Sequence, residues 1–271
     1  MKTQVILVTG ASSGIGKSTA HRLIKDGHKV YVAARRLAKM KDLEDAGATA
    51  LEMDVTIDSN MNKAVEQIIK EQGRIDVLVN NAGYAIYGSV EETSIEDARR
   101  QFEVNIFGLA RLTQLVLPHM RAQKSGKIIN MSSMGGKMYT PMGAWYHATK
   151  HALEGWSDCL RLELKQFNIN VVIIEPGGIK TEFDDVMYDS LKGNSGSGPY
   201  ASLASKVKKG SDTMYNKLAS KPEVIAKAVS EAVKSKRPKT RYRRGFMAKP
   251  GVFMRTFFGD RFWDFAVMRS I

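Results

Sequence analysis

Two side chains that can move a proton stand four positions apart in this chain. Tyr146 and Lys150 belong to the run Ala-Trp-Tyr-His-Ala-Thr-Lys at 144–150. If this segment is helical, the phenol and the ammonium share one face and lie one turn apart. A free tyrosine has a pKa of about 10, and a nearby cation favours the phenolate and lowers that pKa. The spacing predicts a tyrosine that exchanges a proton with the oxygen of a carbonyl or an alcohol.

A glycine-rich turn near the start of the chain has the order of a phosphate-binding element. An apolar run at 3–8 leads into Thr-Gly-Ala-Ser-Ser-Gly-Ile-Gly at 9–16, and a helical pattern follows at 17–25. Glycines let the backbone approach a pyrophosphate, and a helix N-terminus offers free N–H groups. The glycine spacing is GxxxGxG and departs from the common GxGxxG pattern. The residues expected to contact a dinucleotide here are Gly10, Ser12, Ser13, Gly14, Ile15 and Gly16.

Strand-like and helix-like segments alternate along the chain, which predicts a parallel sheet covered on both faces. Parallel crossovers are nearly always right-handed, so we expect one α/β domain over residues 1–271 with a doubly wound sheet, a Rossmann fold. The expected strands are 4–8, 29–33, 49–53, 77–79, 127–131, 170–174 and 240–242. The expected helices are 15–26, 38–45, 59–72, 95–122, 144–167 and 222–234.

The segment 184–216 interrupts this alternation. It contains Gly-Asn-Ser-Gly-Ser-Gly-Pro at 193–199, which is a flexible composition. It follows a strand end, where ligands bind in open α/β sheets. We interpret it as a mobile lid over the substrate, with a surface insertion as the alternative.

Composition bounds the class of protein. A chain of 271 residues with 43% hydrophobic residues can bury one large core. Cys159 is the only cysteine, so no internal disulfide forms and a reducing, cytoplasmic location is expected. The first residues lack a secretory apolar region, and no run approaches about 18 apolar residues, so no transmembrane helix is expected. No metal site is predicted.

The formal charge of +13 is concentrated in a basic and aromatic C-terminal extension at 235–271. A nucleic-acid interface would need a recognisable reading module, and the sequence offers none. A basic amphipathic helix could contact an anionic membrane surface. We prefer a third interpretation, in which a solvated basic loop leads to a terminal helix whose aromatic residues pack on the core or on a second subunit.

Six motifs in order resemble those of the short-chain dehydrogenase/reductase superfamily, the NAD(P)(H)-dependent oxidoreductases with a Rossmann fold. The resemblance is dense over residues 2 to about 185 and nearest to the retinol and steroid dehydrogenase branch and its bacterial relatives. The motifs are the glycine-rich turn at 9–16, Asp-Val at 54–55, Asn-Asn-Ala-Gly at 80–83, Asn105 with Ser-Ser at 132–133, the Tyr146 and Lys150 pair, and Pro-Gly-Gly-Ile-Lys-Thr at 176–181.

The resemblance implies catalytic roles. Tyr146 is the general acid in carbonyl reduction or the base in alcohol oxidation, and Lys150 lowers its pKa and bonds the nicotinamide ribose. Ser133, thirteen residues before Tyr146, polarises the substrate oxygen. Ser132 is the weaker candidate because successive strand residues face opposite sides. Asn105 holds a water in a proton relay toward the lysine, or alternatively serves as a structural amide in the helix.

The resemblance also implies further contacts to the dinucleotide. Asp54 accepts a bond from the adenine amino group, and the nicotinamide lies against the turn after the sixth strand. The expected contacts are Asp54, Val55, Asn81, Ala82, Gly83, Tyr146, Lys150, Pro176, Gly177, Ile179 and Thr181.

The end of the second strand predicts NADP(H) as the cofactor. NAD-binding relatives carry an acid there that bonds the ribose 2′-OH. Here Ala34 takes that place and is followed by Arg35 and Arg36. A guanidinium suits a 2′-phosphate, so Arg35 is the expected contact and Arg36 a second.

The substrate is expected to be a small apolar molecule. The pocket predicted at 85–87, 135–143, 177–178 and the lid is rich in methionine, and Lys137 is the one charged anchor predicted there. The sequence therefore predicts an NADPH-dependent carbonyl reductase for an apolar ketone, aldehyde or secondary alcohol. Alternatives are an oxidative retinol- or steroid-type dehydrogenase and a non-catalytic dinucleotide-binding sensor. By resemblance, a homodimer or homotetramer through the helices at 95–122 and 144–167 is expected.

Overall fold

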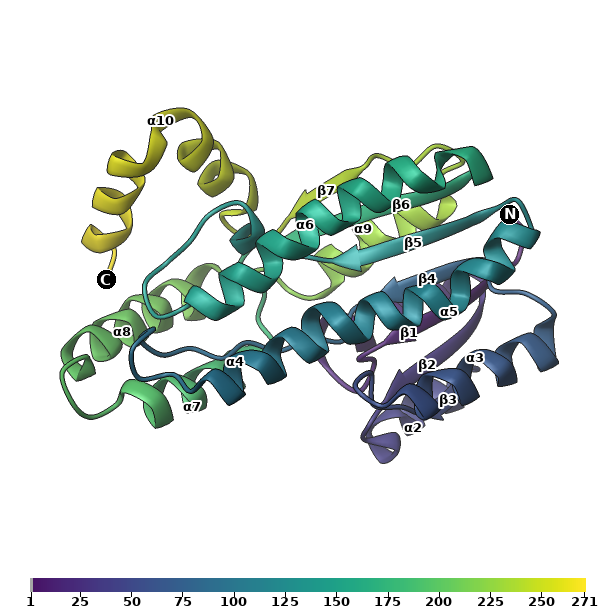
Figure 1. Ribbon diagram of the computed structural model, residues 1–271, viewed down its shortest axis with the longest axis horizontal. Helices are drawn as coiled ribbons and strands as arrows, with labels where there is room; N and C mark the ends of the chain where they lie inside the picture. Colours follow the sequence, from purple (N-terminus) through teal and green to yellow (C-terminus); the bar gives the residue numbers. More distant parts are fainter. Residues whose placement is uncertain (1) are drawn as a thin grey trace.

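A single parallel sheet forms the centre of the computed structural model (Figure 1). The structure describes residues 2–271, apart from the side chains of 213–217. Within them seven strands lie in the order β3-β2-β1-β4-β5-β6-β7. Every neighbouring pair is parallel, so the predicted doubly wound Rossmann sheet is confirmed. The strands are β1 Val5–Thr9, β2 Lys29–Ala34, β3 Thr49–Glu52, β4 Val77–Asn80, β5 Gly126–Met131, β6 Ile169–Pro176 and β7 Arg241–Arg244.

Helices cover both faces of the sheet because successive strand residues point to opposite sides. On β1, Ile6 and Val8 join the core beneath α1 and α9, whereas Val5 and Leu7 join the core beneath α3, α5 and α6. Two separate cores therefore flank the sheet. The helices are α1 Gly14–Lys25, α2 Lys41–Asp45, α3 Asp58–Gln72, α4 Ile95–Phe102, α5 Leu109–Ala122, α6 Ala144–Leu164, α7 Phe183–Ser195, α8 Ala201–Leu218, α9 Glu223–Lys234 and α10 Ala248–Arg269.

The long helix predicted at 95–122 is interrupted by a π-helical turn. Residues Glu103–Gly108 form this turn between α4 and α5, and it contains Asn105. Such turns are rare in helices and are frequent at functional sites. A Cβ on Gly108 would lie 2.2 Å from the carbonyl oxygen of Val55. A glycine here lets the turn approach the segment that follows β3.

The segment predicted as a flexible lid is helical. It folds into α7 and α8, joined by a turn that contains Gly198 with φ of +87°. Met187 and Leu191 of α7 and Val207 of α8 form a third apolar cluster with Tyr87 and Met142. The helix pair therefore closes one end of the molecule over the loops that follow β4 and β5. Motion of this lid stays a prediction.

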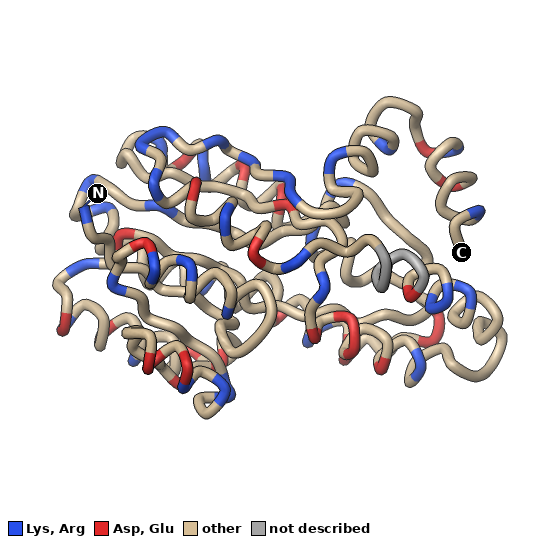
Figure 2. The backbone as a smooth tube through the Cα atoms, turned by 180° about the vertical axis from the view of Figure 1, so that it is seen from behind, with Lys and Arg blue, Asp and Glu red and all other residues tan. Residues whose placement is uncertain are grey.

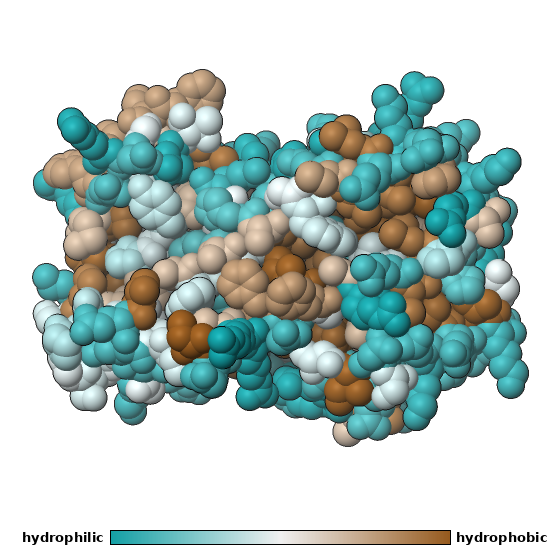
Figure 3. Space-filling view, viewed as in Figure 1, coloured by the Kyte–Doolittle hydropathy of each residue, from teal (hydrophilic) through white to brown (hydrophobic). Residues whose placement is uncertain are grey.

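Helix α10 stands apart from the sheet at the upper left of Figure 1. It is kinked at Gly259, where φ is 76° and ψ is −175°. Trp263 is buried, but five phenylalanines of this helix are exposed, and Figure 3 shows apolar side chains in tan beside hydrophilic ones in teal at this end of the molecule. Among the aromatic residues of α10, Trp263 alone is buried against the rest of the chain, and packing of the five phenylalanines on a second subunit stays a prediction. None of the helices in the described part of the chain has the length and apolar character needed to cross a bilayer.

Charged residues of both signs are interspersed over the backbone in Figure 2. The basic run that leads into α10 is not simply solvated, as the sequence suggested. Arg241 and Arg243 of β7 pair with Glu175 of β6, and Arg244 lies 3.3 Å from Glu231 of α9.

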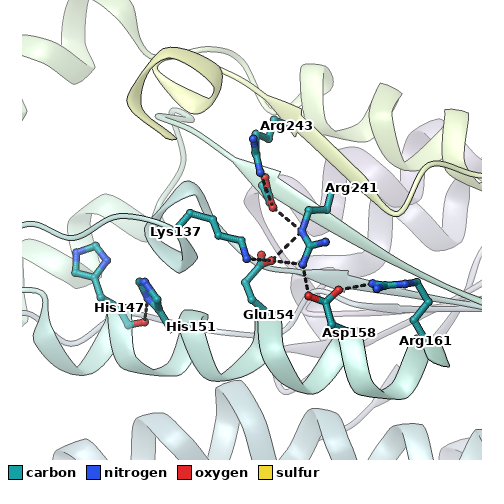
Figure 4. Close-up of polar contacts among 9 residues, drawn as sticks. Lys137, His147, His151, Glu154, Asp158, Arg161, Arg241 and Arg243 are labelled. Atoms are coloured by element: carbon teal, nitrogen blue, oxygen red, sulfur yellow. Dashed lines mark hydrogen bonds and ion pairs between the residues drawn. The ribbon is translucent and has the colours of Figure 1, made fainter. Parts of the chain in front are cut away.

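A buried ion network joins the edge strand β7 to α6 (Figure 4). The guanidinium of Arg241 lies 3.0 Å from a carboxylate oxygen of Glu154, 2.7 Å from Asp158 and 3.1 Å from Glu175. The ammonium of Lys137 lies 3.2 Å from Glu154 on the other side. Glu154 and Glu175 are fully buried, so they need these cations to offset the loss of water.

We expect Arg241→Met to lower the free energy of unfolding by about 3 kcal/mol, because it leaves two buried carboxylates short of a cation. Urea unfolding followed by circular dichroism measures this. Arg237→Met is the matched control, since Arg237 is exposed and outside the network, and its effect should stay within about 0.5 kcal/mol. Equal effects of the two substitutions would contradict the role of Arg241.

Candidate active site

A cavity of about 890 Å³ opens at the carboxyl ends of the strands. Each residue that the sequence assigns to dinucleotide binding lines it, from the glycine-rich turn to Thr181. Tyr146, Lys150 and Ser133 line it as well, whereas Asn105 lies behind its wall. The fold therefore brings together motifs that are separated by more than a hundred residues in the sequence.

The glycine-rich turn has the shape that a pyrophosphate requires. Gly10 and Gly14 have φ of +66° and +53°, which favour glycine. A Cβ on Gly16 would lie 2.3 Å from the carbonyl oxygen of Gly10, so no side chain fits there. Ser13 at the start of α1 makes no capping bond with its side chain, which leaves the N–H groups of the first turn available to an anion. These residues fit a dinucleotide.

The loop after β4 is held against this turn by polar contacts. The amide of Asn81 donates to the carbonyl oxygens of Thr9 at 2.9 Å and Gly10 at 3.2 Å. The hydroxyl of Thr9 accepts from the backbone N–H groups of Asn81 and Ala82, each at 3.0 Å. The side chain of Asn81 therefore positions the glycine-rich turn, in addition to lining the cavity.

Two arginines stand at the end of β2 beside the cavity. A guanidinium nitrogen of Arg36 lies 3.3 Å from the hydroxyl of Ser12, which belongs to the glycine-rich turn. Arg35 is 4.0 Å from a carboxylate oxygen of Asp54 and is mostly exposed. Both cations line the cavity and β2 contributes no carboxylate there, although Arg36 lies 3.7 Å from a carboxylate oxygen of Glu182.

Tyr146 lies in the first turn of α6, with its ring between Tyr87, His147 and Phe183. Burial raises the pKa of its phenol well above the usual value, and a hydrogen bond with Ser133 acts in the opposite direction. The raised pKa is opposite to the direction predicted from the Tyr-Lys spacing, because burial has the largest effect and the negative charge of Asp184 acts in the same direction. The phenol is therefore protonated at neutral pH.

Lys150 lies one turn further along α6, with its nitrogen 5.8 Å from the centre of the Tyr146 ring. The ammonium donates to the carbonyl oxygen of Met131 at 2.9 Å. Burial lowers the pKa of Lys150 to about 8, and the negative charge of Glu154, one further turn along α6, acts to raise it. Glu154, which belongs to the ion network with Arg241, therefore helps to keep the buried side chain of Lys150 positively charged.

Ser133 and Ser132 have different surroundings, as the alternation of strand residues predicts. The hydroxyl of Ser133 accepts from the N–H of Gly135 at 3.0 Å and faces Tyr146. The hydroxyl of Ser132 is buried and has no hydrogen-bond partner within the described residues. Ser133 is therefore the serine that can contact a substrate oxygen beside the phenol.

Asn105 connects the π-helical turn to the site. Its side-chain amide donates to the carbonyl oxygen of Tyr84 at 3.0 Å and to the hydroxyl of Thr149 at 3.1 Å. Its oxygen accepts from the N–H of Tyr84 at 3.1 Å. Both amide hydrogens are thus used to join the loop after β4 to α6, next to Lys150. A role in a proton relay stays a prediction.

His147 is a positioning residue that sequence reasoning missed. Burial lowers the pKa of its imidazole to about 4, so the ring is neutral. One ring nitrogen is 3.0 Å from the carbonyl oxygen of Gly135, and the other accepts from the N–H of Thr140 at 3.1 Å. The ring therefore joins α6 to the loop that carries Ser133. Its place next to Tyr146 was the only indication in the sequence.

The far half of the cavity is apolar and is walled by α7, α8 and α10. Its lining includes Ile86, Met138 and Met187, as the sequence suggested, with Met254 and Trp263 of α10. Lys137 does not line it and instead pairs with Glu154, so the predicted charged anchor is wrong.

One carboxyl group lies in this apolar region, and sequence reasoning did not select it. Asp184 lines the cavity, and burial raises its pKa to about 7. No ion pair to Asp184 occurs within the part of the chain that the structure describes. Its only indication in the sequence was its place at the start of the predicted lid.

Comparisons with known proteins agree with this arrangement. The family model of the short chain dehydrogenases matches residues 4–191. A 3-ketodihydrosphingosine reductase of Bacteroides thetaiotaomicron is 46% identical over 186 residues, which cover 68% of this chain and 67% of the relative. An NADPH-dependent 3-dehydrocapnine reductase of Ornithobacterium rhinotracheale is 38% identical over 250 residues, which cover 87% of this chain and 86% of the relative.

Solved structures show the same fold. A short-chain dehydrogenase from Streptomyces avermitilis superposes with a TM-score of 0.81 at 32% identity, covering 94% of this chain and 93% of the other. The closed form of a serine dehydrogenase complexed with NADP+ superposes with a TM-score of 0.79 at 29% identity, covering 90% of this chain and 96% of the other.

Proposed function

The chain belongs to the short-chain dehydrogenase family of NAD(P)-dependent oxidoreductases, and we propose that it is an NADPH-dependent reductase of apolar ketones. The observation that carries the proposal is the Tyr146 and Ser133 pair. It lies where the dinucleotide-binding part of the cavity meets its apolar part. A carbonyl oxygen placed there would be within reach of two hydroxyl groups.

The geometry assigns a role to each side chain. When the nicotinamide cofactor is bound, it would supply the hydride to the carbonyl carbon of the substrate. Ser133 and Tyr146 hold the carbonyl oxygen, and Tyr146 donates its proton to that oxygen as negative charge develops. The buried ammonium of Lys150 then stabilises the phenolate that remains. Burial favours the protonated phenol, which is the form that donates to the carbonyl oxygen in reduction.

Charge supports NADPH as the cofactor. Arg35 and Arg36 are cations beside the expected position of the 2′-phosphate, and Arg36 reaches the glycine-rich turn through Ser12. A guanidinium binds a phosphate through charge-assisted and often bidentate bonds. The NADPH-dependent relative and the solved structure with NADP+ are consistent with this choice.

The substrate class that fits best is a long-chain amino ketone. The two relatives are named as reductases of 3-ketodihydrosphingosine and of 3-dehydrocapnine. The apolar half of the cavity suits the chain. Asp184, in the same cavity as Tyr146, would pair with the ammonium. We therefore assign Asp184 as the group that distinguishes an amino ketone from a plain ketone.

We also propose a cytoplasmic location and a homo-oligomer. Exposed apolar side chains lie on the two elements expected to associate, Phe107 in the π-helical turn and Leu162 on α6. Burial of such residues between subunits would stabilise an oligomer.

Tyr146→Phe tests the reaction. We expect it to lower kcat for NADPH-dependent ketone reduction about 10³-fold, because it removes the proton donor without changing the fold. Tyr200→Phe is the control: the hydroxyl of Tyr200 is exposed and bonds Glu91 at 2.8 Å, outside the cavity. Turnover of ketones by Tyr146→Phe at the wild-type rate would exclude Tyr146 as the acid.

Arg35→Ala tests the cofactor. We expect the Kd for NADPH to rise about tenfold, which corresponds to about 1.4 kcal/mol, while the Kd for NADH changes little. Fluorescence titration measures both constants. The control is Lys41→Ala, since Lys41 is an exposed cation nearby that pairs with Asp45 and does not line the cavity. A wild-type protein that binds NADH as tightly as NADPH would contradict the assignment.

Asp184→Asn tests the substrate class. We expect the KM for a long-chain 2-amino ketone to rise about tenfold through loss of a buried charge pair, and the KM for its N-acetyl derivative to stay unchanged. Comparing the two substrates separates recognition of the amine from general damage to the cavity. A parallel rise in both KM values would show that Asp184 only shapes the cavity wall.

A further inference from the structure

The outer face of α10 exposes a continuous set of aromatic side chains. The ring centres of Phe253 and Phe257 are 4.5 Å apart, and those of Phe253 and Phe258 are 6.3 Å apart. Phe258 and Phe262 are 4.8 Å apart, across the kink at Gly259. Phe265 and Met268 are further exposed apolar side chains of α10 nearer the C-terminus, and Phe257 and Phe265 are 71% and 62% exposed. Exposed apolar patches of this kind mark interaction sites.

We propose that this face of α10, defined by these five phenylalanines and Met268, binds the surface of an anionic lipid bilayer. The helix would lie in the plane of the interface, with its rings among the headgroups and upper acyl chains. The docking surface depends only on α10 and does not require the proposed reaction.

The charges on α10 match an anionic surface. Lys249, Arg261 and Arg269 are exposed cations on the same helix as the aromatic set. Its two acids are directed to partners in the protein: Asp260 pairs with Arg255, and Asp264 accepts from the hydroxyl of Tyr139 at 2.9 Å. Basic residues beside an apolar face add electrostatic attraction to anionic lipids.

The same charges disfavour a second copy of this chain as the occupant. A symmetric contact between two α10 faces would bring like charges together, in a chain that already carries a formal charge of +13. An anionic bilayer would pair its headgroups with the basic side chains of α10 and would also bury the phenylalanine rings.

The inner side of α10 is fixed independently of this face. The indole N–H of Trp263 donates to the carbonyl oxygen of Tyr139 at 2.8 Å, and Val252 is buried. Met254, Trp263, Ala266 and Val267 line the cavity. A bilayer on the outer face would therefore lie one helix diameter from the substrate cavity, and docking needs no unfolding of α10.

Sedimentation with vesicles tests the proposal. The full chain is mixed with vesicles of phosphatidylcholine alone or with 30% phosphatidylglycerol, at about 0.1 M salt. We expect at least tenfold stronger partition onto the anionic vesicles. The double variant Phe257→Ser with Phe265→Ser should lower this partition at least tenfold, as should Arg261→Glu with Arg269→Glu. The control, Ile57→Ser with Val90→Ser, removes exposed apolar residues outside α10 and should partition like the wild type.

Reduction of a water-soluble ketone by the same variants shows that they are folded, since none of the substituted residues lines the cavity. Failure of the wild type to bind anionic vesicles would overturn the proposal, and so would unchanged partition of the phenylalanine variant. If the wild type does not partition and the phenylalanine variant converts a dimer to a monomer, the face is a subunit interface. If the wild-type protein does not reduce the ketone, the result counts against the proposed function and not against membrane binding.

Discussion

Burial of the Lys150 ammonium is the constraint on which the site depends. A cation in a dry environment is unstable unless acceptors and counter-charges surround it. Here the carbonyl of Met131 accepts from it, and Glu154 lies one turn away on α6. Glu154 is itself buried and is held by Lys137 and Arg241. The ion pairs that stabilise the charge of Lys150 therefore extend from α6 to β7, the last strand of the sheet.

The interiors of the strands and their carboxyl ends have different roles in this fold. Apolar residues in the strand interiors build the two cores, and polar residues appear where the chain leaves the sheet at the carboxyl edge. His147, Asn81 and Asn105 then join the loops at that edge to each other by hydrogen bonds. A buried polar side chain with all its bonds made restricts the loops more than an apolar contact would, because each bond has a preferred direction.

Local motifs made much of the fold and site predictable. The alternation of apolar strands and amphipathic helices predicts the parallel sheet, and the glycine-rich turn and the Tyr146 and Lys150 pair predict the cavity lining. The parts that were missed depend on contacts between distant segments. The glycine-rich segment that forms α7 and α8 is ordered by packing against Tyr87 and Met142, which local composition does not record. The pKa of Tyr146 follows from burial, and the position of Asp184 follows from the path of α7, and neither property can be read from spacing.

The helices that wall the apolar half of the cavity lie outside the sheet and its two cores. Among the described residues, those of α7, α8 and α10 contribute to neither of the two cores that flank the sheet. Substitutions in these helices that keep Phe183, which packs on Tyr146, can therefore change the shape of the cavity while the two cores stay intact. The molecule is modular in this sense: α7, α8 and α10 can vary in sequence and reshape the apolar half of the cavity, while the sheet and the two cores beside it stay the same.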